Sequence, residues 1–99
     1  MQVHAAAALS NLARGNEGTQ MAISRAGGIG PLLAVVASRN SQAQAQGASA
    51  VAQLCRFNRE NQDSVARSGG IPMLVQLLAS HNPLEVRSLM SPIAPKSME

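Results

Sequence analysis

Apolar residues recur along this chain three and four positions apart, which is the spacing of one face of an α-helix. The two clearest stripes consist of Ile29, Leu32, Leu33 and Val36, and of Ile71, Leu74, Val75 and Leu78. They predict helices over about 29–38 and 71–80. Pro31 and Pro72 fall in the first turn of these helices, where a missing N–H group does no harm.

The two stripes belong to a longer repeat, because the sequence matches itself at an offset of about 42 positions. The tripeptide Gly-Gly-Ile at 27–29 aligns with the same tripeptide at 69–71, and Asn16 aligns with Asn58. Each unit then holds three predicted helices. The first, at about 17–26 and again at 60–68, begins after the capping Asn and ends at the Gly-Gly pair, where glycine can take a left-handed conformation.

The third helix of the unit is the longest, and we expect it at about 42–56 with an earlier copy at 2–14. Its predicted core stripe consists of Ala5, Ala8, Leu9 and Leu12 in the earlier copy, and of Gly47, Ala50, Val51 and Leu54 in the later one. A second stripe of small or polar residues runs beside it: His4, Ala7, Asn11 and Arg14, then Gln46, Ser49, Gln53 and Arg56. Its polarity predicts that it faces solvent along the stacked third helices.

These features together resemble the armadillo repeat family. The resembling segments are AAAALSNLA at 5–13, NEGTQMAISRAGGIGPLLAVVAS at 16–38 and NRENQDSVARSGGIPMLVQLLAS at 58–80. The resemblance implies an all-α fold, a right-handed α-solenoid (superhelix) of three-helix armadillo-type repeats. It divides the chain into a third helix of a partial repeat at 1–14, a repeat at 15–57, a repeat with a truncated third helix at 58–91, and an irregular tail at 92–99.

The resemblance also implies a function, since the third helices of armadillo proteins line a concave groove that binds extended peptides or partner helices. In the importin-alpha branch, each third helix carries a Trp four residues before an Asn. Asn11 matches that Asn, but Ala7 stands at the Trp position. The next unit has Ser49 and Gln53 in these places, so the Trp array that packs Lys side chains is missing.

The chemistry of the second stripe supports a general version of this groove. Asn11 and Gln53 can each donate and accept hydrogen bonds, as an extended backbone requires. Arg14 and Arg56 repeat the same geometry and could bind carboxylates of an acidic partner. A simpler explanation competes, because the solvent-facing side of any helix is polar and repeated Arg can serve solubility. The leading hypothesis is a protein–protein interaction scaffold, and the alternative is a structural spacer or end segment of a longer solenoid with no ligand of its own.

Composition narrows the function classes. The 99 residues are 45% hydrophobic but only 1% aromatic, and the net charge is +3. The basic residues form no dense cluster and few aromatic residues are available for stacking, which argues against nucleic-acid binding. A single cysteine, Cys55, excludes an internal disulfide and fits the cytoplasm, or the nucleus. No stretch has the length of a membrane span. His4 and His81 lack partners at metal-ligand spacing, and no nucleophile–base pair is evident, so we expect neither a cofactor nor an enzyme.

Both ends of the repeat pattern depart from a regular array. The sequence begins inside a third helix, which leaves the Ala5/Leu9/Leu12 face uncapped. Pro92 and Pro95 fall where the last third helix should continue, and proline breaks a helix interior. Two explanations stay open: the chain is a fragment or short product of a longer armadillo protein, or it self-associates through its uncapped ends.

Overall fold

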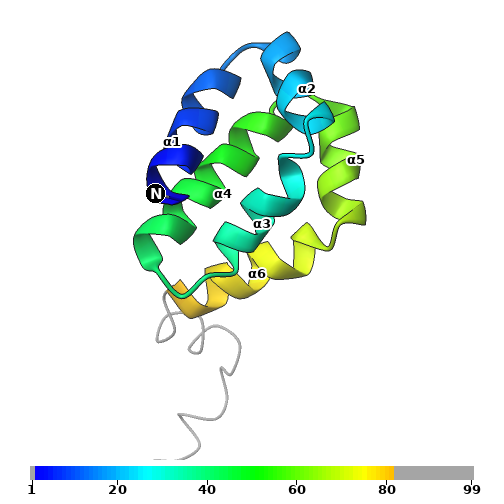
Figure 1. The fold of residues 1–99 in the computed structure, drawn as a ribbon. Helices are drawn as coiled ribbons and strands as arrows, with labels where there is room; N and C mark the ends of the chain where they lie inside the picture. Colours follow the sequence, from blue (N-terminus) through cyan, green and yellow to red (C-terminus); the bar gives the residue numbers. More distant parts are fainter. Residues whose placement is uncertain (1, 82–99) are drawn as a thin grey trace, which may run out of the picture.

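The computed structural model describes residues 2–81, and in this part the chain forms six α-helices and no strand (Figure 1). The helices are α1 (Gln2–Ala13), α2 (Glu17–Arg25), α3 (Ile29–Val36), α4 (Ser41–Cys55), α5 (Arg59–Arg67) and α6 (Gly70–His81). The expected all-α class is confirmed, and each helix predicted within these residues is present. The truncated third helix expected before residue 91 lies outside the described residues. The expected break at Pro92 and Pro95, with the boundary between 91 and 92, lies outside the described residues.

Local sequence signals set the helix ends as predicted. Asn16 caps α2 by accepting a hydrogen bond from the Thr19 main-chain N–H at 2.9 Å, and Asn58 caps α5 in the same way. Asn40 gives α4 a third cap of this kind. Gly27 and Gly69, the first members of the two Gly-Gly pairs, have φ angles of 82° and 81°. This left-handed conformation favours glycine and turns the chain sharply into α3 and α6.

Each helix that occurs twice lies beside its copy in the neighbouring repeat. Figure 1 shows α1 beside α4, α2 beside α5 and α3 beside α6, and residue contacts join all three pairs. Within one unit, α3 also packs along α4. The repeat seen in the sequence is therefore also a repeat in space, with helices of one kind stacked together.

The core lies where α3 and α4 meet. All four stripe residues of α3 are buried, as are Gly47, Ala50, Val51 and Leu54 of α4. Gly47 allows the close approach, because a Cβ there would come within 3.1 Å of Val35 Cγ1 and 3.3 Å of the Val36 main-chain nitrogen. For these two helices the predicted core stripes are confirmed.

The prediction that Ala5, Ala8, Leu9 and Leu12 form the buried face of α1 is wrong. Ala5 and Ala8 are exposed, Leu9 is half-buried, and the side chain of Leu12 is 58% exposed. The helix instead buries a neighbouring face, formed by Ala6, Ser10 and Ala13. The reason is geometric: α1 packs mainly on α4, and among the described residues no helix covers the Ala5/Leu9/Leu12 face as α3 covers its copy in α4.

The apolar stripe of α6 is also largely outside the core in this structure. Ile71 and Val75 are each 59% exposed and Leu78 is 70% exposed, while Leu74 is half-buried. Met73 and Leu77 pack at the edge of the core. The copy of this stripe in α3 is buried because α4 covers it, and no described helix stands in that place against α6.

Candidate functional site

The predicted groove residues lie on α1 and α4, in what we call the α1/α4 stripe: His4, Ala7, Asn11, Arg14, Gln46, Ser49, Gln53 and Arg56. The two helices run side by side, so the two halves of the stripe are brought together (Figure 1). On α1, His4 and Asn11 are exposed, as is Arg14 just after the helix, and Ala7 is half-buried. This half faces solvent as the polarity of the pattern predicts.

The α4 half of the stripe is less open than expected. Gln46, Ser49 and Gln53 are half-buried, and only Arg56 is exposed. The Ser49 hydroxyl shares a hydrogen bond of 3.0 Å with the hydroxyl of Ser10 on α1. The expectation that the whole stripe faces solvent therefore fails on α4, because α1 packs against that flank of the helix.

Gln53 has an unusual environment. Its side-chain Oε1 is buried and has no hydrogen-bond partner within residues 2–81. Its main-chain carbonyl is already engaged, since Gln20 Nε2 donates to it at 2.7 Å. A buried acceptor without a partner is costly, so an N–H group that reached Oε1 would gain a hydrogen bond and remove that cost.

A buried polar cluster holds the carboxyl end of α4 in place. Gln20 donates to the carbonyls of both Gln53 and Arg56, while Asn61 donates to the carbonyl of Leu54 at 2.9 Å. Asn58 Nδ2 in turn donates to Gln20 Oε1 at 3.0 Å. The last carbonyls of a helix have no partner inside it, so these side chains supply the missing donors. The cluster thereby fixes the chain at Arg56.

Arg14 and Arg56 line one pocket at the end of the stripe. The pocket has a volume of about 440 Å³ and is lined by Arg14, Gly15, Asn16, Glu17, Gln20, Arg56 and Phe57. The structure therefore brings together the two arginines that the repeat placed in equivalent positions. A guanidinium group presents donors in a planar fork that matches a carboxylate, so the pocket can bind an acidic group.

Phe57 is the site residue that the sequence pattern did not single out. Its side chain is 91% exposed and its φ angle is 53°, in the left-handed region where a bulky residue is strained. The Arg56 guanidinium carbon lies 5.5 Å from the centre of its ring, within the range of a cation–π contact. The repeat offset contained a signal for this site, because it aligns Phe57 with Gly15, whose φ is 63°.

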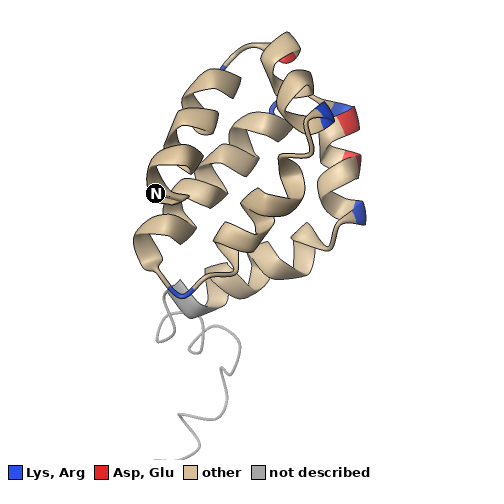
Figure 2. Ribbon diagram, in the orientation of Figure 1, with Lys and Arg blue, Asp and Glu red and all other residues tan. Residues whose placement is uncertain are grey.

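Charged residues are distributed around the ends of the helices. Figure 2 shows the Lys and Arg positions at the loops, at the end of α2 and on α5, while the ribbons of α1, α3 and α6 carry none. Residues 2–81 contain no group of three or more His, Cys, Asp or Glu placed to hold a metal ion. Cys55 is half-buried, and this burial raises the pKa of its thiol above the ordinary value of 9.0.

No helix in the described part of the chain combines the length and the apolar character needed to cross a bilayer. Comparison of the chain with family models, with curated proteins and with solved structures finds no significant match in any of the three.

Proposed function

We propose that the chain is a segment of an armadillo-type solenoid that binds an extended, acidic segment of a protein partner along the α1/α4 stripe. The observation that carries this proposal is the pocket shared by Arg14, Arg56 and Phe57 at the end of the stripe. A single helix surface would carry one such arginine, whereas the stacking of α1 on α4 places two equivalent ones on the same pocket.

The chemistry of the pocket suggests the kind of side chain that it binds. Two guanidinium groups favour a carboxylate, and the exposed ring of Phe57 offers an apolar surface beside them. Glu17 also lines the pocket, which disfavours a ligand with several carboxylates in one place. We therefore expect an Asp or Glu next to an apolar residue.

Further along the stripe, Asn11 and Gln53 supply polar groups for the partner's main chain. Asn11 is exposed and Gln53 is half-buried. An extended backbone offers alternating N–H and C=O groups, which side-chain amides can bind. A single cysteine and the absence of a disulfide suit such a partner in the cytoplasm or nucleus.

The strain at Phe57 supports a role for that ring. The exposed side chain of Phe57 gains little from packing. The residue at the equivalent repeat position is Gly15, which has a similar left-handed backbone conformation. Backbone strain of this kind costs on the order of 1–3 kcal/mol and tends to occur at binding sites. A ligand that packs on the ring would account for a phenylalanine at this position.

The test is a selection of random peptides on the immobilised chain, followed by affinity measurement of the selected peptides by fluorescence anisotropy. Replacing both arginines, Arg14→Gln with Arg56→Gln, should weaken binding by about tenfold or more, as expected for the loss of charge-assisted hydrogen bonds. The pair Asn11→Ala and Gln53→Ala should weaken it as well. The matched control is Arg25→Gln with Arg67→Gln, which removes the same charge from the other repeated arginine pair, on α2 and α5.

Selected peptides should be enriched in Asp or Glu beside an apolar residue. If they bind both double variants as tightly as they bind the original chain, the α1/α4 stripe is not the binding site. If the selection returns no peptide, the result favours the alternative function, a structural segment of a longer solenoid with no ligand of its own.

A further inference from the structure

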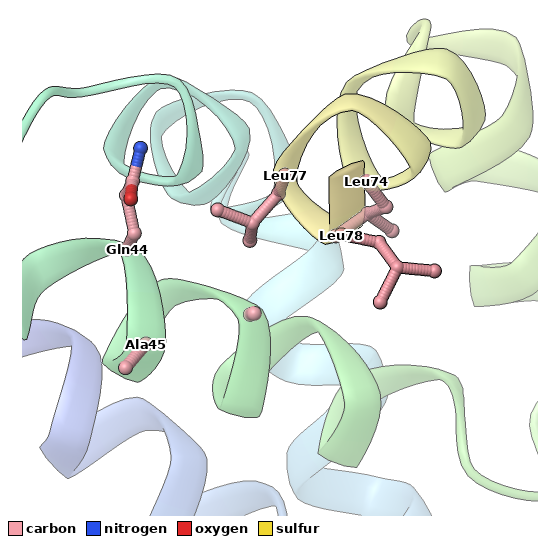
Figure 3. A pocket seen from close by; sticks show the side chains of 6 residues that line it. Gln44, Ala45, Leu74, Leu77 and Leu78 are labelled. Atoms are coloured by element: carbon pink, nitrogen blue, oxygen red, sulfur yellow. The ribbon is translucent and has the colours of Figure 1, made fainter. Parts of the chain in front are cut away.

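A second surface of the molecule is apolar and lies apart from the α1/α4 stripe. It is a pocket of about 400 Å³ between α4 and α6, lined by Gln44, Ala45, Ala48, Leu74, Leu77 and Leu78. Figure 3 shows the leucines of α6 on one side of this pocket and the side chains of Gln44 and Ala45 on the other. The exposed Ile71 and Val75 also lie on α6, in the same stripe as Leu74 and Leu78.

The first unit shows what covers such a stripe. The same four positions in α3 are buried by α4, a third helix whose Gly47, Ala50, Val51 and Leu54 are themselves buried. A helix with this pattern, laid against α6 in the same way, would fill the pocket and cover the exposed side chains of Ile71, Val75 and Leu78.

The chain itself presents a helix of that kind. The stripe of α1 repeats that of α4 at the repeat offset, with Ala5, Ala8, Leu9 and Leu12 at the four positions. In the structure most of this stripe is uncovered, since Ala5, Ala8 and Leu12 are exposed, while Leu9 is half-buried at the edge of the core. Within residues 2–81, one side thus presents a third helix whose stripe is largely uncovered, and the other presents a second helix with no described third helix against it.

We propose that copies of this chain assemble head to tail, with α1 of one copy packed on α6 and α4 of the next. This contact repeats the α3–α4 and α1–α4 contacts that each copy already makes internally. It joins two different surfaces, so it is a heterologous interface that leaves one free surface of each kind and lets the assembly grow. The contact does not depend on a bound peptide.

The rival occupant of the pocket is the chain's own segment after His81, and its sequence suits the place less well. At the repeat offset it would put Leu89 at the position of Gly47, Pro92 at that of Ala50 and Lys96 at that of Leu54. The counterparts of these three positions in α4 are all buried. A leucine, a proline and a lysine fit such positions poorly, and of the four positions only Ile93, in place of Val51, is well suited. The helix α1 offers small or apolar residues at all four: Ala5, Ala8, Leu9 and Leu12.

Polar chemistry at the proposed contact also fits a second copy. The hydrogen bond between Ser10 and Ser49 joins α1 to α4 inside the chain. At the new contact Ala7 of one copy takes the place of Ser49, and Ala52 of the next copy takes the place of Ser10. The contact therefore buries no hydroxyl group without a partner. Neither α1 nor α6 contains Asp, Glu, Lys or Arg, so the helices can pack together without burying a charge of their own.

The experiment places a charge on one surface at a time. Leu12→Glu blocks the α1 surface, and Leu78→Glu blocks the α6 surface. Both side chains are more than half exposed, so the fold of each copy should survive, which circular dichroism verifies. Ala34→Glu is the matched control, because it adds the same charge at an exposed position of α3, outside both surfaces. Ala8→Glu and Val75→Glu serve as second variants if either leucine variant fails to fold.

The readout is the mass in solution by analytical ultracentrifugation from about 1 μM to about 100 μM, a range that weak, small interfaces occupy. The unchanged chain and the Ala34→Glu control should grow with concentration beyond a dimer. Each surface variant alone should stay at the 10.2 kDa of one chain. A mixture of the two should form a one-to-one dimer, because each supplies the surface that the other lacks.

Three results would overturn the proposal. The unchanged chain could stay a monomer throughout, which would mean that its own C-terminal segment or nothing covers α6. One surface variant could dimerise by itself, which would indicate a symmetric pairing of like surfaces. The two variants could also fail to combine in the mixture, which would show that α1 and α6 do not meet.

Discussion

The helices α3 and α6 carry the same apolar stripe at the same repeat positions, yet their surroundings differ completely. Ile29 is 4% exposed in α3, while its counterpart Ile71 is 59% exposed in α6. The difference does not come from the helices themselves, since both form and both follow a Gly-Gly turn. It comes from α4, which covers α3 and has no equivalent over α6 among the described residues.

This comparison shows that one stripe can be core or surface, depending on its neighbour. A helix in a repeat array contributes its apolar face to a core only when the next helix is in place. Some other pairs of equivalent residues also differ in burial, such as Leu54, which is fully buried, and Leu12, which is 58% exposed. Substitutions at matched positions can therefore measure how much each neighbour contributes.

The largest expected effect contrasts Ile29→Ala with Ile71→Ala. The first removes buried side-chain atoms from the core and should lower the free energy of unfolding by about 2–5 kcal/mol. The second removes a mostly exposed side chain and should change it by about 0.5 kcal/mol or less. Urea unfolding in dilute solution, followed by circular dichroism, measures both. Equal losses would mean that a helix covers α6 in solution.

A smaller effect is expected from the polar cluster, where Asn61 corresponds to Thr19 in the first unit. Asn61 is fully buried and donates to the carbonyls of Gln20 and Leu54. Asn61→Ala leaves both carbonyls without that donor and should cost about 1–3 kcal/mol of stability. Thr19→Ala is the control, since its structural hydrogen bond uses the main-chain N–H, which the substitution keeps. A loss as large at Thr19 would contradict the special role of the cluster.

Phe57 and Gly15 form the third pair, and here the expected change has the opposite sign. Phe57→Gly relieves the left-handed strain and loses almost no packing, so it should raise the free energy of unfolding by about 1 kcal/mol. Gly15→Ala should lower it by about 1 kcal/mol, because no atom lies within 4 Å of an added Cβ and only the backbone conformation matters. Thermal unfolding of both variants checks the signs. The more stable Phe57→Gly variant should also bind the selected peptides more weakly.

The smallest expected effect concerns Cys55, whose counterpart is the buried Ala13. Desolvation raises the pKa of the Cys55 thiol above 9.0 in the folded chain, so the unfolded chain releases this proton at lower pH. The contribution of this thiol to the free energy of unfolding is therefore fully present below about pH 9 and decreases as the pH rises further. Unfolding measured at neutral and alkaline pH should show a decline that is smaller in Cys55→Ala. Identical pH profiles would show that the thiol is freely solvated.

Much of the local structure could be predicted from the sequence. Asn16, Asn58 and the Gly-Gly pairs mark helix ends through interactions within a few residues, so their roles are confirmed. The faces of the helices were harder, because the pattern that buries Leu54 leaves its counterpart Leu12 exposed. At the candidate site, the repeat placed Arg14 and Arg56 in equivalent positions and both line one pocket, but the bond between Ser49 and Ser10 and the position of Phe57 were not foreseen.

The sequence by itself determined the repeat, the six helices, their caps and which residues share a helix face. These features depend on hydrogen bonds and backbone preferences that act over one or two turns. Only the tertiary structure decided which of the equivalent stripes are buried, because burial depends on whether a particular neighbour lies against each face. It also decided that Gln20, Asn58 and Asn61 meet at the end of α4, since these residues come from different units and are joined only by packing.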